Sequence, residues 1–331
     1  MMDSSPSQPQ QPKLFPSIVD RLQSLHYSKR TEESYIQWIK RFITFHGKRH
    51  PREMGITEIE AYLNHLAEEK KVSASTQNQA KSALHFLYKE VLEYDLPVME
   101  NLIKVKASKA LPVVLTRHEV QSILSSLDGT AWLIASLLYG SGLRVMECLR
   151  LRIADIDVDK LEILVRDTNG YKNRITLLPA SLVEPLKAHL QNVQLSHEED
   201  LAKGFGETRL PAGLAKKYPD TGKDWDWQYV FPSSRLSVDQ ETGVIYRHHA
   251  DEKTIQRAVK KVTDEMGIKK AVTPNIFRHS FATHLLQGGQ DIRTVQELLG
   301  HADVTTTMIY TKVVITGGRG IASPLDIISQ D

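Results

Sequence analysis

Only two segments of this chain, residues 161–166 and 174–178, alternate apolar and polar residues with the period of two that a β-strand requires. Between them lies Asn169-Gly170, a pair that favours a tight type I′ turn because both central residues of that turn take a positive φ. The sequence therefore predicts one small antiparallel sheet. Strands do not alternate with helices often enough to indicate a doubly wound sheet. The expected fold class is mainly α with a small antiparallel β-sheet.

The length predicts two domains, because 331 residues is about twice the ~150 residues of a typical domain. Apolar residues recur at helical spacing in four early segments, at about 17–25, 30–46, 57–69 and 73–93. Thr116 is a plausible N-cap for a later helix, with Glu119 as its capping-box partner. We expect a disordered lead-in over 1–13, a helical domain over 14–97, a linker over 98–115 and a second domain over 116–331.

The composition is that of a soluble globular protein, with 41% hydrophobic and 25% charged residues. No apolar run approaches the roughly 20 residues that span a bilayer, so we expect a cytoplasmic protein. The single cysteine, Cys148, excludes an intramolecular disulfide and a cysteine-built zinc finger, and is expected to be a buried small hydrophobe. A net charge of +2 is too small to establish a nucleic-acid partner by itself.

Basic residues nevertheless gather in pairs in the first domain, at Lys29-Arg30, Lys40-Arg41, Lys48-Arg49 and Lys70-Lys71. Any one pair is as well explained by a solvated helix surface. Their repetition favours contact with phosphates, which makes Lys40 and Arg41 candidate DNA-binding residues.

Three segments of the second domain carry reactive residues where packing alone does not require them. Arg144 follows a Gly-containing turn in SGLRVMECLRL and opens a short helix. Asn275 and Arg278 share one face of a helix in TPNIFRHSFATHLL. In LLGHADVTTTMIYT, His301 follows a helix end and Tyr310 lies near the end of a short helix. One arginine alone usually forms a surface salt bridge, but this combination indicates a site for an anion.

In this order, the three segments resemble the tyrosine site-specific recombinases, whose pattern is Arg, then H-x-x-R, then His or Trp, then Tyr. The resemblance covers the chain from about Phe15 to Leu325. It implies a helical, SAM-like core-binding domain followed by a catalytic domain, the two clamping DNA. It also implies a homotetramer on two DNA sites, and no metal or other cofactor.

The resemblance gives each of these residues a role. Arg144 and Arg278 would neutralise the charge that spreads over the phosphate oxygens, since guanidinium groups bind phosphate with paired hydrogen bonds. Tyr310 would attack phosphorus to give a 3′-phosphotyrosine and a free 5′-hydroxyl. His301 would orient the phosphate and assist proton transfer. A tyrosine with a pKa of about 10 needs help to lose its proton.

The sequence departs from the family pattern at two positions. Asn275 stands where the H-x-x-R motif has histidine, and its amide can still donate a hydrogen bond to a phosphate oxygen. Asn169 stands where the family hairpin has the lysine that protonates the departing 5′-oxygen. Lys172, just beyond the turn, is the alternative donor if the hairpin bends differently.

A narrower resemblance is to the integron integrases, which capture gene cassettes by recombining a folded single-strand hairpin with a double-stranded site. It rests on an insertion at about 195–232 and on YRHHADEKTIQRAVKK at 246–261. Trp227, His248 and His249 match positions that contact bases left out of the hairpin stem, where an aromatic platform is needed. The alternative is a core tryptophan beside a surface histidine pair.

The first hypothesis is therefore an active integron-type recombinase. The alternatives are a catalytically impaired, DNA-binding relic and a recombinase that acts on ordinary duplex sites. A metal hydrolase is poorly supported, because His279 and His284 are five residues apart rather than four and no carboxylate stands between them in a ligand pattern.

Overall fold

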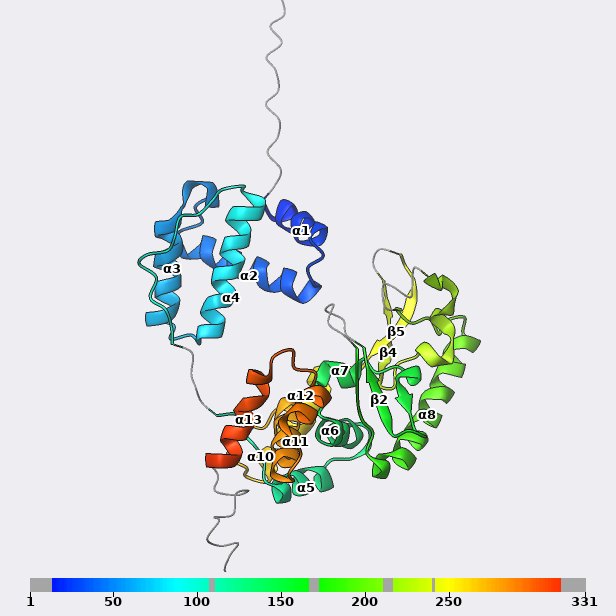
Figure 1. Ribbon diagram of the computed structural model, residues 1–331. Coiled ribbons are helices and arrows are strands. Elements are labelled where there is room, and N and C mark those ends of the chain that lie inside the picture. The colour runs from blue at the N-terminus through cyan, green and yellow to red at the C-terminus, as the bar shows by residue number, and fades with distance from the viewer. Residues whose placement is uncertain (1–13, 107–110, 167–172, 211–216, 240–241, 317–331) are drawn as a thin grey trace, which may run out of the picture. The chain divides into compact units, whose positions relative to one another are not determined.

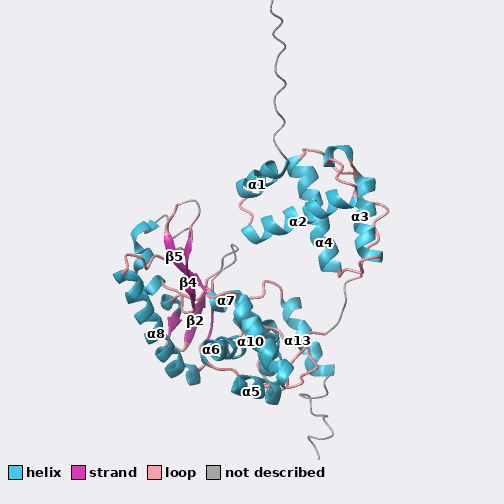
Figure 2. Cartoon of the chain, turned by 180° about the vertical axis from the view of Figure 1, so that it is seen from behind, coloured by secondary structure: helices cyan, strands magenta, loops and turns pink. Residues whose placement is uncertain are grey.

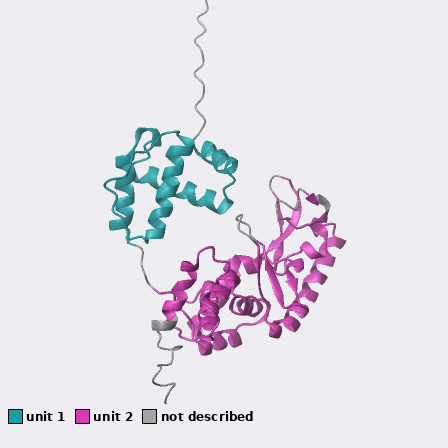
Figure 3. Cartoon of the chain, viewed as in Figure 1, with its two compact units in different colours: residues 1–110 teal, residues 111–331 magenta. Residues whose placement is uncertain are grey.

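The computed structural model describes residues 14–106, 111–166, 173–210, 217–239 and 242–316 (Figure 1). The chain divides into two compact units, residues 1–110 and 111–331 (Figure 3). Both are mainly helical, and strands occur only in the second among the described residues (Figure 2). The predicted fold class is confirmed. Over the same residues, no helix is both long and apolar enough to cross a membrane.

Unit 1 contains the four predicted helices packed around an aromatic core. They are α1 (Leu14–Ser24), α2 (Lys29–Phe45), α3 (Ile56–Glu68) and α4 (Ala74–Phe86), with a short 3₁₀ helix η1 (Pro51–Glu53) and a π-helix η2 (Leu87–Val91) that continues α4. The Ser73 hydroxyl caps α4 by accepting a hydrogen bond from the Thr76 N–H. Phe42, Tyr62 and Tyr88 meet edge to face in the core, where large aromatic side chains bury the most apolar surface.

Backbone hydrogen bonds fix both ends of the predicted linker. At its start, the Asn101 N–H donates to Glu60 Oε1 at 2.9 Å and the Val105 N–H donates to Gln77 Oε1 at 3.1 Å, so this part lies against α3 and α4. At its end, the Leu115 N–H donates to the Ser280 hydroxyl in unit 2 at 3.0 Å.

Unit 2 is built around one apolar helix, α6 (Gly129–Ser141), whose residues Leu133 to Leu138 are all buried. A helix that is apolar on all sides needs neighbours all round, and Figure 1 shows α6 among the other helices of this unit. These are α5 (Arg117–Ser126), α7 (Val145–Leu149), α8 (Val183–Ala202), α10 (Glu252–Glu265), α11 (Pro274–Gln287), α12 (Ile292–Leu299) and α13 (Val304–Thr316). Short turns are η3 (Ile153–Asp155), η4 (Ala180–Leu182), η5 (Pro219–Lys223) and η6 (Trp225–Trp227).

The predicted hairpin forms the core of a three-stranded antiparallel sheet in the order β1 (Ile156–Asp157), β2 (Glu162–Val165), β3 (Arg174–Leu177). Val165 pairs with Arg174, and the Asn169-Gly170 turn lies outside the described residues. The expectation of one sheet was incomplete. A second pair, β4 (Pro232–Val238) and β5 (Ile245–His249), has no run of alternating apolar residues, because neither strand has a buried face.

Candidate active site

Arg278 is the buried centre of the candidate site. It lies on α11, whose first turn contains Pro274, and its side chain is only 4% exposed. Its two terminal nitrogens donate to the Gly142 carbonyl at 2.6 Å and to the Leu299 carbonyl at 2.7 Å. These carbonyls lie at the C-terminal ends of α6 and α12, where helix geometry leaves them without helical partners. A guanidinium placed there donates to the otherwise unpaired carbonyls of both helix ends. Its positive charge also interacts favourably with the negative ends of the two helix dipoles.

Glu147 joins three arginines into one cluster. Arg174 donates to both of its carboxylate oxygens at 2.9 and 2.7 Å, Arg144 donates to Oε1 at 2.7 Å, and an Arg278 nitrogen lies 3.6 Å from Oε2. Burial raises the pKa of Glu147, but the hydrogen bonds and charge of Arg174 outweigh it and bring the pKa to about 2. One carboxylate therefore opposes three guanidinium groups, which leaves positive charge for an anion.

Arg144 is the accessible member of this cluster. Its side chain is 48% exposed, whereas that of Arg174 is 13% exposed and anchored to the Leu298 carbonyl as well. Burial and the charge of Arg144 lower the pKa of Arg278 to about 9, so Arg278 remains charged at neutral pH.

His301 follows Gly300, the left-handed C-cap of α12, and bridges the arginine cluster to α13. Its Nε2 lies 3.1 Å from an Arg278 nitrogen, and its Nδ1 lies 2.8 Å from the Thr307 hydroxyl. Arginine can only donate, so Nε2 accepts from Arg278, and in the neutral ring Nδ1 carries the proton and donates to Thr307. Burial and the charge of Arg278 lower the pKa of His301 to about 4, which keeps the ring neutral.

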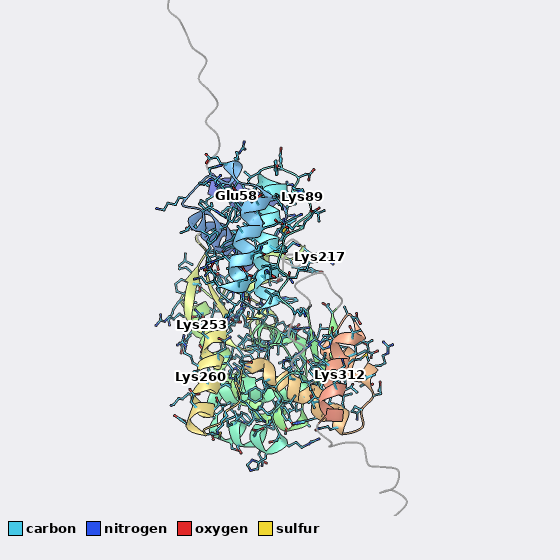
Figure 4. The ribbon with its side chains drawn as sticks, turned by 90° about the vertical axis from the view of Figure 1, so that its left-hand side faces the viewer. Glu58, Lys89, Lys217, Lys253, Lys260 and Lys312 are labelled. Atoms are coloured by element: carbon cyan, nitrogen blue, oxygen red, sulfur yellow. The ribbon has the colours of Figure 1, made fainter. Side chains whose placement is uncertain are left out.

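Tyr310 is buried beside His301. It lies within the 13-residue helix α13 rather than near the end of a short helix, and it is 2% exposed, while Lys312 on the same helix is exposed (Figure 4). The rings of His301 and Tyr310 stack with centroids 6.3 Å apart. Burial raises the pKa of Tyr310 despite the opposing charges of Arg278 and Arg144.

The hydroxyl of Tyr310 has a partner that sequence reasoning did not assign to this site. It lies 2.8 Å from Nδ1 of His279, the residue that follows Arg278 on α11. The sequence singled out His279 only as a weak metal-ligand candidate. The sequence feature that could have identified His279 as a site residue is its position directly after Arg278 in the segment RHS.

Arg144, Arg278, His301 and Tyr310 thus come together, but Asn275 does not join them. It is exposed in the first turn of α11, and no hydrogen bond among the described residues links it to the other four. Asn169 and Lys172 lie outside the described residues. In the described ranges, no group of three or more His, Cys, Asp or Glu side chains is placed to hold a metal ion.

Trp227, His248 and His249 lie around a second buried arginine. Arg152 donates to the Trp227 carbonyl at 2.7 Å, and its guanidinium lies 3.5 Å from the Tyr229 ring centroid. The His249 ring meets the Tyr229 ring edge to face, 5.4 Å between centroids, and lies 3.9 Å from the His248 ring. All three candidates are partly exposed, and burial lowers the pKa of His249 to about 4. The two histidines and Tyr229 form a neutral aromatic group, whereas the Trp227 ring centroid lies 5.2 Å from the Arg166 guanidinium.

In unit 1, Lys40 and Arg41 are exposed on α2, each above an aromatic ring. The Lys40 ammonium lies 5.3 Å from the Phe15 ring centroid, and the Arg41 guanidinium lies 4.9 Å from that of Trp38. Such cation–π contacts orient the stems and leave the charges at the surface.

Family comparison matches both units. The phage integrase family matches residues 113–315, and the N-terminal SAM-like domain of phage integrases matches residues 14–98.

Individual relatives agree with this match. A protein named integrase/recombinase from Escherichia coli is 47% identical over 316 residues, covering 96% of this chain and 94% of its own length. The tyrosine recombinase XerA of Thermococcus onnurineus is 38% identical over 219 residues, 65% of this chain and 64% of its own length. Among solved structures, the XerH recombinase bound to a palindromic difH substrate has a similar fold, with a TM-score of 0.62 and 18% identity over 93% of this chain and 85% of its own.

Proposed function

The chain belongs to the phage integrase family of tyrosine recombinases, and on this premise we propose that it is an integron integrase that inserts and excises gene cassettes. It cuts and rejoins DNA through a 3′-phosphotyrosine intermediate. The observation that carries the proposal is that the buried Tyr310 ring stacks on His301, whose Nε2 accepts a hydrogen bond from Arg278. In the proposed reaction, the positive charge of the arginine cluster around Glu147 binds a DNA phosphate.

The arginines stabilise the transition state in this mechanism. Arg278 is held rigidly by two carbonyls and Arg144 reaches solvent, so the two guanidinium groups contact the non-bridging phosphate oxygens from a fixed base. Preorganised charge of this kind costs no reorganisation during the reaction. Neutral His301 accepts from Arg278 and thereby orients it. Exposed Asn275, which lies apart from these residues in the DNA-free protein, is proposed to donate from its amide to the phosphate once DNA is bound.

Bond making and breaking then occur at one phosphorus. The Tyr310 oxygen forms the O–P bond, and the bond from phosphorus to the 5′-oxygen breaks. The 5′-oxygen takes a proton from a general acid, for which Lys172 is the candidate in this chain. Because the phosphotyrosine keeps the bond energy, rejoining needs neither ATP nor a metal.

DNA is the proposed partner, by extension from relatives such as XerH that were solved with DNA. Lys40 and Arg41 contact the backbone of a duplex, while Trp227, His248 and His249 contact extrahelical bases of a folded hairpin. The support for the second contact is the partly exposed aromatic group around Tyr229. The working assembly is a homotetramer on two sites in the cytoplasm, with the helical domain at 14–97, the linker at 98–115 and the catalytic domain at 116–331.

A second candidate function is that of a DNA-binding relic with impaired cleavage. The observation in its favour is the presence of two amides, Asn169 and Asn275, where the family has a lysine and a histidine. An amide cannot act as a general acid, and a positioned acid contributes about 10²–10⁴-fold to such reactions.

Covalent trapping tests the proposed function. The full chain is incubated with a nicked integron attachment-site duplex and with the folded single strand of a cassette site. Wild type should form a covalent adduct and recombine the folded strand in preference to the duplex donor. Tyr310→Phe should bind both DNAs without forming the adduct. An adduct with the Phe variant would show that the nucleophile is another residue, and equal use of both donors would favour a duplex recombinase.

Cleavage rates of variants at Asn169 and Lys172 distinguish an active recombinase from a catalytically impaired relic. If Asn169 limits cleavage, Asn169→Lys should raise the rate by about 10²-fold or more. If Lys172 already serves as the acid, Lys172→Ala should abolish cleavage. A 5′-phosphorothiolate leaving group departs without a proton, so it should restore cleavage wherever the missing acid is the defect. If the 5′-phosphorothiolate substrate is not cleaved faster by a chain that binds the site well, then proton donation is not the defect.

A further inference from the structure

The contact between His279 and Tyr310 has no part in the proposed mechanism of cleavage. Helices α11 and α13 bring His279 Nδ1 to 2.8 Å from the Tyr310 hydroxyl, with the ring centroids 5.6 Å apart. Tyr310 is 2% exposed, so bulk water has little access to its hydroxyl. Any proton that leaves the phenol has to pass first to a neighbouring side chain.

The imidazole of His279 is in the protonation state that a proton acceptor needs. Burial and the adjacent charge of Arg278 lower the pKa of His279, so the imidazole is neutral at pH 7 and one ring nitrogen can accept a proton. Burial also raises the pKa of Tyr310, which increases the need for an acceptor.

Both ring nitrogens of His301, the other imidazole beside Tyr310, already take part in hydrogen bonds. Its Nε2 accepts from Arg278 and its Nδ1 is bonded to the Thr307 hydroxyl. Among the described side chains, His279 is therefore the acceptor that lies within hydrogen-bond distance of the phenol and has a nitrogen directed at it.

We propose that His279 is a catalytic residue, the general base that takes the proton of Tyr310 at Nδ1. This inference rests on the proposed function. As the Tyr310 O–H bond breaks, an Nδ1–H bond forms. The phenolate oxygen bonds to phosphorus, and the 5′-oxygen leaves with the electron pair of its bond and takes a proton from a general acid or from water. During rejoining, the imidazolium of His279 returns its proton to the departing tyrosine oxygen.

Helix α11 contains a matched control for this role. Five residues after His279, His284 makes the same kind of contact, with its Nδ1 2.9 Å from the Tyr139 hydroxyl and the ring centroids 5.8 Å apart. Burial lowers the pKa of His284 as well. The two pairs resemble each other in geometry and environment, but only His279 faces the proposed nucleophile.

The test compares His279→Gln with His284→Gln. The measured quantity is the rate of covalent adduct formation on a nicked integron attachment-site duplex with a 5′-bridging phosphorothiolate, because its sulfur leaves without protonation and proton removal from Tyr310 is isolated. We expect His279→Gln to slow the adduct by about 10²–10⁴-fold, and His284→Gln to stay within a few-fold of wild type. Both variants should bind the duplex as wild type does.

A more acidic nucleophile provides the second readout. Replacing Tyr310 with a fluorinated tyrosine of lower phenol pKa should accelerate the His279→Gln chain far more than the wild-type chain, because less help is needed to remove the proton. If His279→Gln loses duplex binding, His279→Asn, whose Oδ1 occupies the position of Nδ1, is used in the same comparison.

The possible failures are distinguishable. A His279→Gln chain that forms the adduct at the wild-type rate or faster would overturn the assignment and leave the proposed function intact. Equal acceleration of both chains by the fluorinated tyrosine would also overturn it. A wild-type chain that forms no adduct on this substrate would overturn the proposed function and, with it, the role of His279.

Discussion

Glu147 is the residue on which the arrangement of the arginines depends. Its carboxylate receives a paired contact from Arg174, one from Arg144 and a longer-range attraction from Arg278. Three buried or half-buried cations without this anion would repel one another, and a buried charge that loses its partner is costly. The carboxylate thus keeps two phosphate-binding groups close together before DNA arrives.

Replacing Glu147 with glutamine should destabilise unit 2 in a pH-dependent way. The folded pKa of about 2 lies below the ordinary value of 4.5, so the stabilisation is fully present above about pH 4.5 and is lost as the pH falls towards 2. At neutral pH the loss should be on the order of 3 kcal/mol, the free energy that corresponds to that shift. Urea unfolding of Glu147→Gln and wild type between pH 2 and 7 measures it, and the two curves should converge at the acid end.

Glu184→Gln is the control for this prediction. Glu184 pairs with Lys187 on the surface of α8 at 2.9 Å, with 81% of its side chain exposed. Exposed pairs contribute little to stability, so this variant should behave as wild type. A Glu147→Gln chain as stable as Glu184→Gln at neutral pH would contradict the central role of Glu147.

At this scale the sequence identifies site residues by their type and spacing, and residues whose role comes from a contact between distant segments give no such signal. Arg144, Arg278, His301 and Tyr310 stand out because nothing in local packing requires them. Arg174 lies 27 residues from Glu147 along the chain, and His279 lies 31 residues from Tyr310, so the first contact exists only after β3 has packed against α7 and the second only after α11 has packed against α13. Periodicity carries no information about such contacts.

The ends of α6 and α12 show how elements position the site. Each helix ends at a glycine in the left-handed region, Gly142 with φ +64° and Gly300 with φ +66°, a conformation that lets the last carbonyls point away from the helix axis. Those carbonyls hold Arg278. The site thus depends on where two helices stop as much as on the residues that they carry.

Gly142→Ala should therefore damage both stability and cleavage. An added Cβ would overlap the ring of buried Phe281, in addition to the strain of a positive φ. We expect a loss of about 2–5 kcal/mol, from about 1–2 for the backbone and about 1–3 for overpacking. Cleavage should fall as well, because the Gly142 carbonyl that orients Arg278 moves. Thermal unfolding and the adduct assay measure the two effects.

Gly129→Ala separates the two causes. Gly129 opens α6 with φ +49°, and a Cβ there meets no other atom within 4 Å. This variant should show the backbone strain alone and retain normal cleavage. If the two alanine variants lost equal stability, the close approach of Phe281 would not be the reason that Gly142 is needed.

Helices and strands can be predicted where the local sequence contains a capping motif or a regular alternation of apolar residues. The capping box of Thr116 and Glu119 forms at the start of α5, and the alternating segments form β2 and β3. The pair β4–β5 has no such signal, since its strands are half exposed on both faces. Its position depends on contacts with the buried Arg152–Tyr229 pair, which joins segments far apart in the sequence.

At the scale of the whole molecule, unit 2 folds around histidines that remain uncharged. Burial lowers the pKa of several of its imidazoles: His189, His248, His249, His279, His284 and His301. For His249 and His301 the value is about 4. These imidazole rings accept hydrogen bonds and pack as neutral aromatic groups. Protonation of the rings would disrupt both kinds of contact.

The stability of unit 2 should consequently fall as the pH drops from about 6.5 to about 4. In that range the unfolded chain binds more protons than the folded one, because its histidines titrate near 6.5, and the free energy of unfolding then decreases with falling pH. Tryptophan fluorescence during urea unfolding reports mainly this unit, since Trp132, Trp225 and Trp227 are three of the four tryptophans. His249→Asn should flatten the dependence, whereas His118→Asn, at an exposed position on α5, should not. A free energy of unfolding that stayed constant from pH 7 to pH 4 would contradict this account, because it would mean that these imidazoles are hydrated or paired in the folded protein and titrate there as they do in the unfolded chain.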